Sequence, residues 1–554
     1  MSNQEKTNSA DASKSSLHDE SHSEKHETEV VVNSTAESED APAEGYPQGL
    51  HLVILVVAVN MAIFLASLDQ TIIGTAIPKI TDEFHGLRQV SWYGSAYFMC
   101  LGGFQSVWGK AMRFFPLKIT FITTVLIFEL GSLICGVSPN STAFIVGRAI
   151  AGVGGAGITT GATVILALSA EPAKRPTLMG TMGLSYCLAF LLGPIVGGAF
   201  SESVTWRWCF YINLPIGGVS LALVYVFFKT PSTAKVEEAT LSEKLRHMDP
   251  IGVMLAMGAI ISFILALQYG GVSYAWNSSM VIGLLVGFVV ILLTLAGWEY
   301  SQGDYAMLPR RLFQRRSLWA GSLFQFHFVG CYFLLLFYLP IYFQSINGDS
   351  AIMSGVHNLP MVISACLFII MGGVAVEKTQ FATPYMTGGA ALATVATGLL
   401  YTLDVGTSTG RWVGYQILVG AALAFPFQNA LNIVQSDTPP RDISTVTSSL
   451  YFFQILGGAF SISAAQSAFV NRLIHSLAVN APGINPQKVI ITGASELRAV
   501  FTAEQLPGVL QAYMDGLKAA FAVGIGMAGM AFIASFLSPW KRLYVKPGEG
   551  AAIA

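Results

Sequence analysis

Charged residues are scarce in this sequence of 554 residues. Asp, Glu, Lys and Arg make up 11% of the chain, and hydrophobic residues make up 53%. A soluble globular protein carries roughly 25% charged residues. The scarcity therefore excludes an ordinary soluble fold and indicates that most of the chain lies in lipid.

Groupings of metal-ligating or nucleophilic side chains are also missing. All six cysteines fall inside apolar runs, without the spacing of a disulfide framework or a metal site. The nine histidines are scattered, and three of them lie in the N-terminal tail. We therefore expect no metal, no cofactor other than a proton gradient, no nucleic-acid partner and no enzymatic activity. A membrane-embedded enzyme such as an acyltransferase would need His, Asp or Cys gathered near one face.

The N-terminus lacks the basic start and short apolar stretch of a cleaved signal peptide. Residues 1–48 instead hold 11 of the 32 acidic residues and few large apolar ones. A segment of this composition cannot bury a core. We expect a disordered cytoplasmic tail, with the first membrane helix as the targeting signal.

Long apolar runs follow the tail, and about 20 apolar residues suffice for a helix to cross a bilayer. We count fourteen candidate spans, which predict an all-α membrane protein. They are 51–76, 90–109, 117–137, 143–169, 177–200, 207–228, 250–269, 278–299, 317–343, 351–375, 385–403, 412–434, 444–470 and 519–538.

The loops between these runs differ in basic residues. With the N-terminus inside, eighteen Lys and Arg residues face the cytoplasm and eight face outward. Because basic loops stay on the cytoplasmic side, both termini are predicted to be cytoplasmic. The sequons at Asn140 and Asn277 then lie outside as weak glycosylation candidates.

Two short sequences occur twice. Val146–Gly157 resembles Val413–Ala424, and "GGAF" appears at Gly197–Phe200 and again at Gly457–Phe460. Parallel six-helix repeats are a known transporter architecture. The predicted organisation is a tail (1–48), an N-terminal six-helix half (49–228), a cytoplasmic linker (229–249), two inserted helices (250–299), a basic loop (300–316), a C-terminal six-helix half (317–540) with an outer loop (471–518), and a cytoplasmic tail (541–554).

Asp69 is the only ionisable side chain in the first apolar run, and a carboxylate in hydrocarbon is costly unless it is paired. From the outer ends of their helices, Asp69 lies at a depth of roughly 13 Å and Arg148 at roughly 8 Å. We expect these two residues to pair. A pair that opens lets desolvation protonate Asp69, which makes it a proton switch; the alternative is a static bridge. Glu129, in the third span, is a second candidate for proton coupling or for binding cationic substrates.

Glycine-rich stretches mark two of the spans. "GVGGAG" (Gly152–Gly157) fits a dinucleotide-binding pattern, but it lacks the preceding strand and the following acid. In a membrane helix such glycines allow close packing. Gly193 and Gly197 are interpreted in the same way, and Pro194 should bend the fifth span, so that this region forms a hinge.

Polar side chains inside other spans are candidates for a substrate cavity. Amides and aromatic rings in a Phe-rich interior suit a large, mostly apolar guest, although each residue alone could instead bridge two helices. They are Gln105, Tyr186, Gln325, His327, Tyr332, Gln428, Asn429, Asn432 and Gln454.

Four motifs between residues 48 and 545 carry a family resemblance. They are "LDQTIIGTAIP" (Leu68–Pro78), "RAIAGVGGAG" (Arg148–Gly157), "GTMGLSYCLAFLLGPIVGG" (Gly180–Gly198) and "WRWCFYINLPIGG" (Trp206–Gly218). The chain resembles the major facilitator superfamily, in particular its fourteen-helix drug:proton antiporters and the fungal toxin-efflux pumps among them. The resemblance implies two six-helix halves plus two inserted helices, Arg148 in proton coupling, and Gly198 in the antiporter motif of the fifth helix. Ala151 replaces a usual glutamine, and Ala189 a usual glycine.

A fifth motif departs from the family. In "GKAMRFFPLK", the residues Gly109, Lys110 and Lys118 are retained, but Arg113 stands where an aspartate is usual and Pro116 where a glycine is usual. The charge relay that latches the inward face of the family is therefore not preserved in its usual form.

The resulting hypothesis is proton-coupled efflux of small, largely apolar compounds, such as fungal metabolites, mycotoxins or drugs, by alternating access. Expected partners are a small-molecule substrate, protons and the lipid bilayer, and the protein is expected to be a monomer in the plasma membrane, with the vacuolar membrane as the alternative. The rival on the same fold is a proton-symporting importer, for example of iron–siderophore complexes.

Overall fold

The computed structural model describes residues 46–84, 90–230, 236–271, 274–492, 494 and 496–543. Most of the predicted N-terminal tail, residues 231–235 of the predicted linker and most of the predicted C-terminal tail lie outside the described residues. The regular secondary structure of the described part is helical, apart from an isolated bridge between Gly270 and Tyr274. Helix is the expected conformation, because lipid cannot hydrogen-bond to exposed backbone groups.

The first part of the bundle contains seven α-helices. They are α1 (Gly49–Phe84), α2 (Val90–Phe114), α3 (Leu117–Val137), α4 (Ser141–Ser169), α5 (Arg175–Ser203), α6 (Trp208–Tyr211) and α7 (Asn213–Phe227), with the 3₁₀ turn η2 (Pro172–Lys174) before α5. The start of α4 is fixed by Asn140, whose side chain accepts a hydrogen bond from the backbone N–H of Ala143 (2.9 Å). The predicted span 207–228 is divided, since α6 and α7 are separate helices.

The middle of the chain holds a short surface helix and two long ones. They are α8 (Leu241–His247), α9 (Pro250–Tyr269) and α10 (Ser279–Gln302), followed by η3 (Gly303–Tyr305) and α11 (Arg310–Phe313). Thr240 and Glu243 form a capping box at the start of α8. Among the residues of α10, only Val281 is buried, so this helix lies at the periphery of the bundle.

The last part of the chain contains the remaining helices. They are α12 (Arg316–Tyr342), the π-turn η4 (Phe343–Asn347), α13 (Ala351–His357), α14 (Leu359–Thr379), α15 (Thr383–Tyr401), α16 (Thr409–Ala424), α17 (Asn429–Ser436), η5 (Pro440–Asp442), α18 (Ile443–Asn480), α19 (Pro486–Ile491), α20 (Leu497–Val500) and α21 (Leu506–Ser535). The predicted spans 351–375 and 412–434 are each divided into two helices. The predicted outer loop 471–518 is mostly helical, because α18 continues to Asn480 and α21 begins at Leu506.

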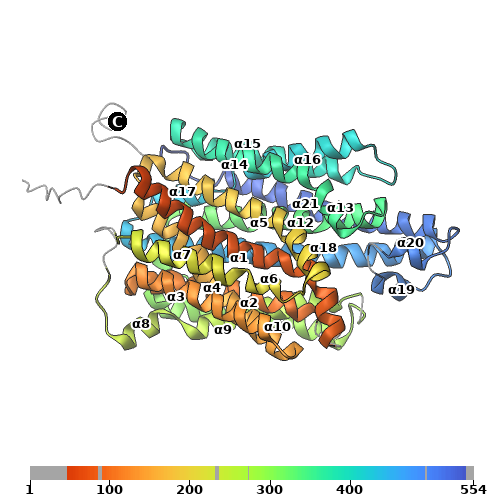
Figure 1. Cartoon of the computed structure of the whole chain (residues 1–554), viewed down its shortest axis with the longest axis horizontal. Helices are drawn as coiled ribbons and strands as arrows, with labels where there is room; N and C mark the ends of the chain where they lie inside the picture. The colour runs from red at the N-terminus through yellow and green to blue at the C-terminus, as the bar shows by residue number, and fades with distance from the viewer. Residues whose placement is uncertain are drawn as a thin grey trace, which may run out of the picture. The chain divides into compact units, whose positions relative to one another are not determined.

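Twelve helical segments of the described residues are long and apolar enough to cross a membrane. The other two predicted spans correspond to α2 and α15, which are long helices packed in the same bundle but fall outside this set. The count of fourteen spans therefore stays a prediction. Helices α8 and the pair α19–α20 lie at opposite ends of the bundle (Figure 1), and the first of these is called the α8 end below.

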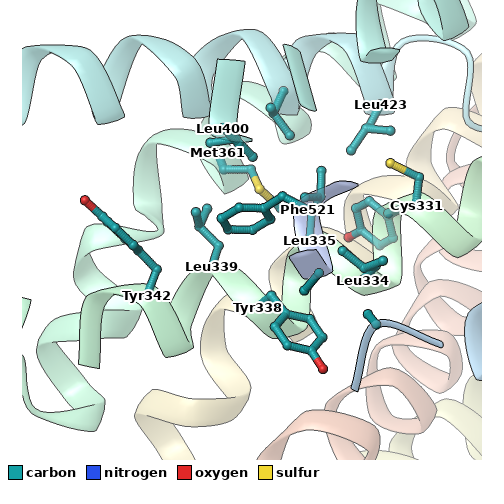
Figure 2. Packing of buried hydrophobic residues seen from close by; sticks show 14 of the residues in the cluster. Cys331, Leu334, Leu335, Tyr338, Leu339, Tyr342, Met361, Leu400, Leu423 and Phe521 are labelled. Carbon is teal, nitrogen blue, oxygen red and sulfur yellow. The ribbon is translucent and has the colours of Figure 1, made fainter. Parts of the chain in front are cut away.

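Two large hydrophobic clusters form the core. One surrounds α12, where Leu335 and Leu339 lie with Met361 of α14, Leu400 of α15 and Phe521 of α21 (Figure 2). The other is centred on α1 to α4 and continues into α17 and α18 through a set of buried side chains from the last third of the chain, which includes Leu431, Val434, Ile443, Val446 and Leu450. The second cluster therefore joins the first part of the chain to the last.

Glycines allow the closest helix contacts. A methyl group at Gly154 of α4 would overlap the backbone of Phe128 on α3, and one at Gly131 of α3 would overlap the backbone of Ala151 on α4. The glycine-rich stretch of α4 therefore packs helix against helix, as predicted.

Candidate functional site

Asp69 of α1 and Arg148 of α4 form an ion pair, and both side chains are fully buried. The guanidinium also donates through Nε to the carbonyl of Tyr93 (3.0 Å), and it lies 4.5 Å from the centroid of the Tyr97 ring. Tyr97 in turn donates its hydroxyl to the carbonyl of Ala66 on α1 (2.9 Å). The predicted contact between Asp69 and Arg148 is confirmed, and the arginine is held by α1, α2 and α4 together.

Glu129 of α3 is a second buried carboxyl group in the same part of the bundle. Among the described residues, neither of its carboxylate oxygens has a hydrogen-bond partner. A methyl group at Gly217 of α7 would overlap Oε1 of Glu129, so the glycine leaves the space that the carboxyl group occupies. One turn further along α3, Ser132 accepts a hydrogen bond from Asn213 (3.1 Å).

A small cavity of about 20 Å³ lies between the first and last parts of the chain. Part of its lining is polar. Gln70 of α1, Gln105 of α2, Thr159 of α4 and Gln454 of α18 contribute to its lining. Gln105 donates to Thr160 (2.8 Å), and its carbonyl oxygen has no partner among the described residues.

The remaining lining is aromatic and aliphatic. Rings come from α5, α12, the segment between α16 and α17, and α18, and Leu101 and Ile455 complete the wall; the rings are those of Tyr186, Phe190, Tyr332, Phe333, Phe427 and Tyr451. Tyr451 shares a hydrogen bond with Thr163 of α4 (2.8 Å). The cavity is therefore built by both parts of the chain.

Four of the predicted substrate-contacting residues line this cavity, namely Gln105, Tyr186, Tyr332 and Gln454. The other five are placed elsewhere: they are Gln325, His327, Gln428, Asn429 and Asn432. Gln325 lies behind the wall, with its amide 3.5 Å from the Gln454 oxygen. His327 is half-buried, and its ring nitrogen is 2.8 Å from the carbonyl of Leu323 one turn earlier on its own helix.

The predicted hinge glycines of α5 are buried. Gly193 faces α1 so closely that a methyl group would overlap the side chain of Thr71. The Thr71 hydroxyl is 3.3 Å from the carbonyl of Ala189 on α5. Pro194 lies inside this helix, and Gly197 and Gly198 are buried near its end.

A network of charges, which we call the α8-end network, joins α2, α11 and α18 around the buried carboxylate of Asp442. Arg311 donates two hydrogen bonds to it (3.0 and 3.1 Å), and Arg113 lies 3.4 Å from it while also pairing with Glu237. The bonds to Asp442 raise the pKa of Arg311. Arg113, the departure from the family motif, therefore connects the first part of the chain to the last. Lys118 lies outside this network, with its amine 5.2 Å from the centroid of the Tyr225 ring.

Lys110 fastens the segment after α10 to α2. Its amine is buried and donates to the carbonyls of Tyr305 (2.9 Å) and Ala306. The next residues are held by the inserted helices, since Asp249 accepts from the N–H of Met307 (2.8 Å) and Glu299 accepts from that of Leu308 (2.8 Å). The inserted helices are thus bonded to the same end of α2 as the α8-end network.

Glycines close two seams at this end. A methyl group at Gly109 of α2 would overlap the Ser448 side chain and lie 2.8 Å from the carbonyl of Ser444 on α18. On the other side of the bundle, one at Gly373 of α14 would lie 2.7 Å from the carbonyl of Pro176 on α5. The α8 end of the bundle is therefore closed in this structure.

An apolar helical bundle that surrounds a cavity, with an ion pair buried beside it, defines a multi-pass membrane transporter. The profile of the Major Facilitator Superfamily matches residues 59–462. The chain therefore belongs to the Major Facilitator Superfamily and handles small-molecule substrates across a membrane.

Relatives match nearly the whole chain. The MFS-type transporter thnB of Trichoderma harzianum is 72% identical over 92% of this chain and 88% of its own length. The MFS-type transporter grgE of a Penicillium species is 54% identical (94% and 93%), and the probable efflux pump gsfJ of Penicillium aethiopicum is 48% identical (94% and 93%).

Solved structures agree on the fold. The proton:xylose symporter XylE matches with a TM-score of 0.59 at 13% identity, covering 89% of this chain and 98% of its own. The human organic anion transporter MFSD10 matches with a TM-score of 0.55 at 15% identity, covering 88% and 100%. At these identities the likeness concerns the fold alone.

Proposed function

We propose that the protein exports small, largely apolar compounds in exchange for protons, by alternating access. The observation that carries the proposal is the fully buried Asp69–Arg148 pair. Asp69 directly precedes Gln70, which lines the cavity. The direction is supported by the relatives whose printed names are efflux pumps and by the antiporter-like motif of α5.

The proton would act on the ion pair. A buried pair is stable only while both partners are charged, and the loss of one partner leaves an uncompensated charge that costs about 3–5 kcal/mol. Protonation of Asp69 from the outside would impose this cost on Arg148 and favour another arrangement of α1 and α4. Release of the proton inside would restore the pair and the closed α8 end.

Short connections would pass this change to the cavity. Gln70 follows Asp69 directly, and Leu101 lies one helical turn after Tyr97, whose ring packs on Arg148. A shift of α1 or α2 at the ion pair therefore moves two elements of the cavity wall. Movement is transmitted in this way because packed helices move as rigid units.

Glu129 would serve as a second proton site. It is buried beside Gly217 in the same part of the bundle as Asp69, and neither of its carboxylate oxygens has a hydrogen-bond partner among the described residues. Two buried carboxylates that repel each other favour a state in which only one is charged. A proton could therefore pass between them while Arg148 keeps a single counter-charge.

The α8-end network would hold the cytoplasmic side closed while the outer side is open. In this proposal the α8 end faces the cytoplasm, both termini are cytoplasmic, and the protein is a monomer in the plasma membrane. Arg113 and Arg311 would release Asp442 when the two parts of the chain separate. Both arginines are partly exposed, so water can replace their partner at modest cost.

Asp69→Asn tests the coupling. In proteoliposomes loaded with a pH dye, a neutral aromatic probe added outside should drive protons out through the wild-type protein and make the lumen alkaline. Asp69→Asn should abolish this signal, because it removes the titrating group while keeping the shape. Glu83→Gln, which changes an exposed carboxylate of the same helix, is the matched control. An undiminished pH change with Asp69→Asn would place the coupling elsewhere.

Direction is tested separately in cells. Expression should lower the accumulation of the probe, and de-energising the membrane should abolish the difference. Higher accumulation on expression would favour the proton-symporting importer on the same fold.

A further inference from the structure

We infer that the cargo is an uncharged, flat aromatic compound with an edge of carbonyl and hydroxyl oxygens, and that each cycle of transport moves net charge. This inference rests on the proposed function and adds a substrate class to it. Three features of the cavity carry it.

The first feature is the presence of three carboxamides, from three helices, in the cavity lining. Gln70, Gln105 and Gln454 come from α1, α2 and α18. A carboxamide both donates and accepts hydrogen bonds, so it matches a carbonyl beside a hydroxyl. Gln105 is only 1% exposed, and its carbonyl oxygen has no partner in the described part of the chain. A buried acceptor without a partner is costly, and a cargo hydroxyl would satisfy it.

The second feature is the set of aromatic rings in the same lining. The centroids of Phe190 and Tyr332 are 6.1 Å apart, and those of Tyr332 and Phe427 are 5.5 Å apart, with the latter pair edge to face. These rings form an apolar surface against which a flat aromatic guest can stack when the helices move apart and widen the cavity. Tyr451 closes the wall toward α4 through its bond to Thr163.

The third feature is the absence of charge among the cavity-lining residues that the structure describes. The nearest carboxylate along α1, Asp69, is already paired with Arg148. A charged cargo would lose its hydration without gaining a counter-charge, which costs far more than burying a neutral group. Aromatic rings also attract cations. The comparison between a neutral and a cationic compound is therefore the strictest test of the inference.

The exchange of a neutral molecule for a proton cannot be electrically silent. One positive charge would move inward for each proton, whatever the cargo gradient. A membrane potential that is negative inside should therefore accelerate export, whereas exchange of a monovalent cation for one proton would not respond.

The binding experiment uses three 1,8-dihydroxyanthraquinones that differ at one substituent. Aloe-emodin carries a neutral hydroxymethyl group, rhein a carboxylate, and a synthetic analogue a trimethylammoniomethyl group. Affinities for the purified full-length protein are measured by calorimetry without a proton gradient. We expect aloe-emodin to bind at least about tenfold more tightly than either charged compound, and tighter binding of the cation or of rhein would overturn the inference.

Two variants link this preference to the cavity. Gln105→Leu should weaken the binding of aloe-emodin about three- to tenfold, because it removes one or two hydrogen bonds. Gln105→Glu keeps the shape and adds a carboxyl group that a bound cation would hold in its charged form, so it should move the preference toward the cation. Gln416→Glu, which changes a buried glutamine of α16 outside the lining whose amide donates to the carbonyl of His357 (2.9 Å), is the control. An unchanged preference in Gln105→Glu would exclude this cavity as the binding site.

The inferred substrate class and the proposed proton coupling are tested by different measurements, so one can be refuted without the other. Asp69→Asn should still bind aloe-emodin in preference to the charged compounds, because binding is measured without a proton gradient. Currents on solid-supported membranes then test charge movement: aloe-emodin should evoke a current with the wild type and none with Asp69→Asn. Wild-type transport of aloe-emodin without current would refute the electrogenic cycle alone.

Discussion

The two charged sites of this protein use the same chemistry in different surroundings. At the Asp69–Arg148 pair both side chains are fully buried. At the α8-end network Asp442 is equally buried, but Arg113 is 15% and Arg311 is 37% exposed. Water can therefore hydrate Arg113 and Arg311 when they separate from Asp442, whereas the buried Arg148 has no contact with solvent. The first site should respond to a proton, and the second to the separation of helices.

The largest expected effect is on stability at the buried pair. Arg148→Ala leaves the Asp69 carboxylate without a counter-charge and should destabilise the protein by about 3–5 kcal/mol. Asp442→Asn should cost less, about 1–3 kcal/mol, because its arginines can be hydrated. Thermal unfolding in detergent compares the two variants. The double variant Asp69→Asn/Arg148→Gln should recover much of the loss, and equal losses for Arg148→Ala and Asp442→Asn would contradict the comparison.

The next effect concerns closure of the α8 end. Gly109→Val should prevent α2 from reaching α18, because its side chain would overlap Ser448. A cysteine placed at Ser444 should then react several-fold faster with a membrane-impermeant maleimide than it does in the Gly109 parent. Gly94→Val is the control, since nothing lies within 4 Å of a methyl group at that position of α2. Equal labelling in both variants would show that Gly109 does not limit closure.

A smaller effect is expected from restoring the family's usual residue. Arg113→Asp places a carboxylate against Asp442 and Glu237, so the α8-end network should weaken and transport should fall about three- to tenfold. Lys118→Asp changes a residue of the same motif that lies outside the network and should alter transport much less. Initial export rates at matched expression measure both.

The smallest effect is at the opposite end, where Glu83 accepts hydrogen bonds from Trp206 (2.7 Å) and Arg207 (2.9 Å). The Trp206 bond, with the charge of Arg207, lowers the pKa of Glu83. The carboxylate therefore stabilises the fold above its ordinary pKa of about 4.3, and this is lost as the pH falls through its lowered value. Glu83→Gln should cost less than about 1 kcal/mol at pH 7 and nothing at about pH 3. Melting temperatures at both pH values check this, and a difference that grows with acid would be inconsistent with it.

The sequence predicted the Asp69–Arg148 contact, because helix rise converts residue number into depth and a buried charge needs a partner. It also predicted the close glycine packing of α4. The α8-end network was not predicted, because Asp442 lies more than three hundred residues from Arg113 and the family motif places a different charge at that position. One feature of the sequence could have indicated the network: Asp442 lies just before the predicted span 444–470, on the side where the predicted loops are rich in Lys and Arg.

The sequence predicted less well which polar residues of the spans line the cavity. Gln454 lines the cavity while Gln325 lies behind it, although both are amides in apolar helices. Hydrophobic periodicity cannot separate these cases, because the side of a membrane helix that faces lipid is as apolar as the side that packs on its neighbours. Gln70 and Thr159 were missed for the same reason. The helical extensions of α18 and α21 were missed because they are more polar than a membrane span.

Helix α10 has much of its surface outside the bundle, where lipid would cover it, since Val281 alone is buried among its residues. Its apolar stretch, Met280–Trp298, extends roughly 28 Å, close to the thickness of the hydrocarbon core, so a thinner or thicker bilayer would change its tilt or its depth. Near its end Trp298 bonds to Asp249 (2.8 Å) and Glu299 to Leu308 (2.8 Å), beside the carbonyls that Lys110 holds. The thickness of the surrounding membrane therefore bears mechanically on the end of α2, and sterol content is a variable that any reconstitution of this transporter has to control.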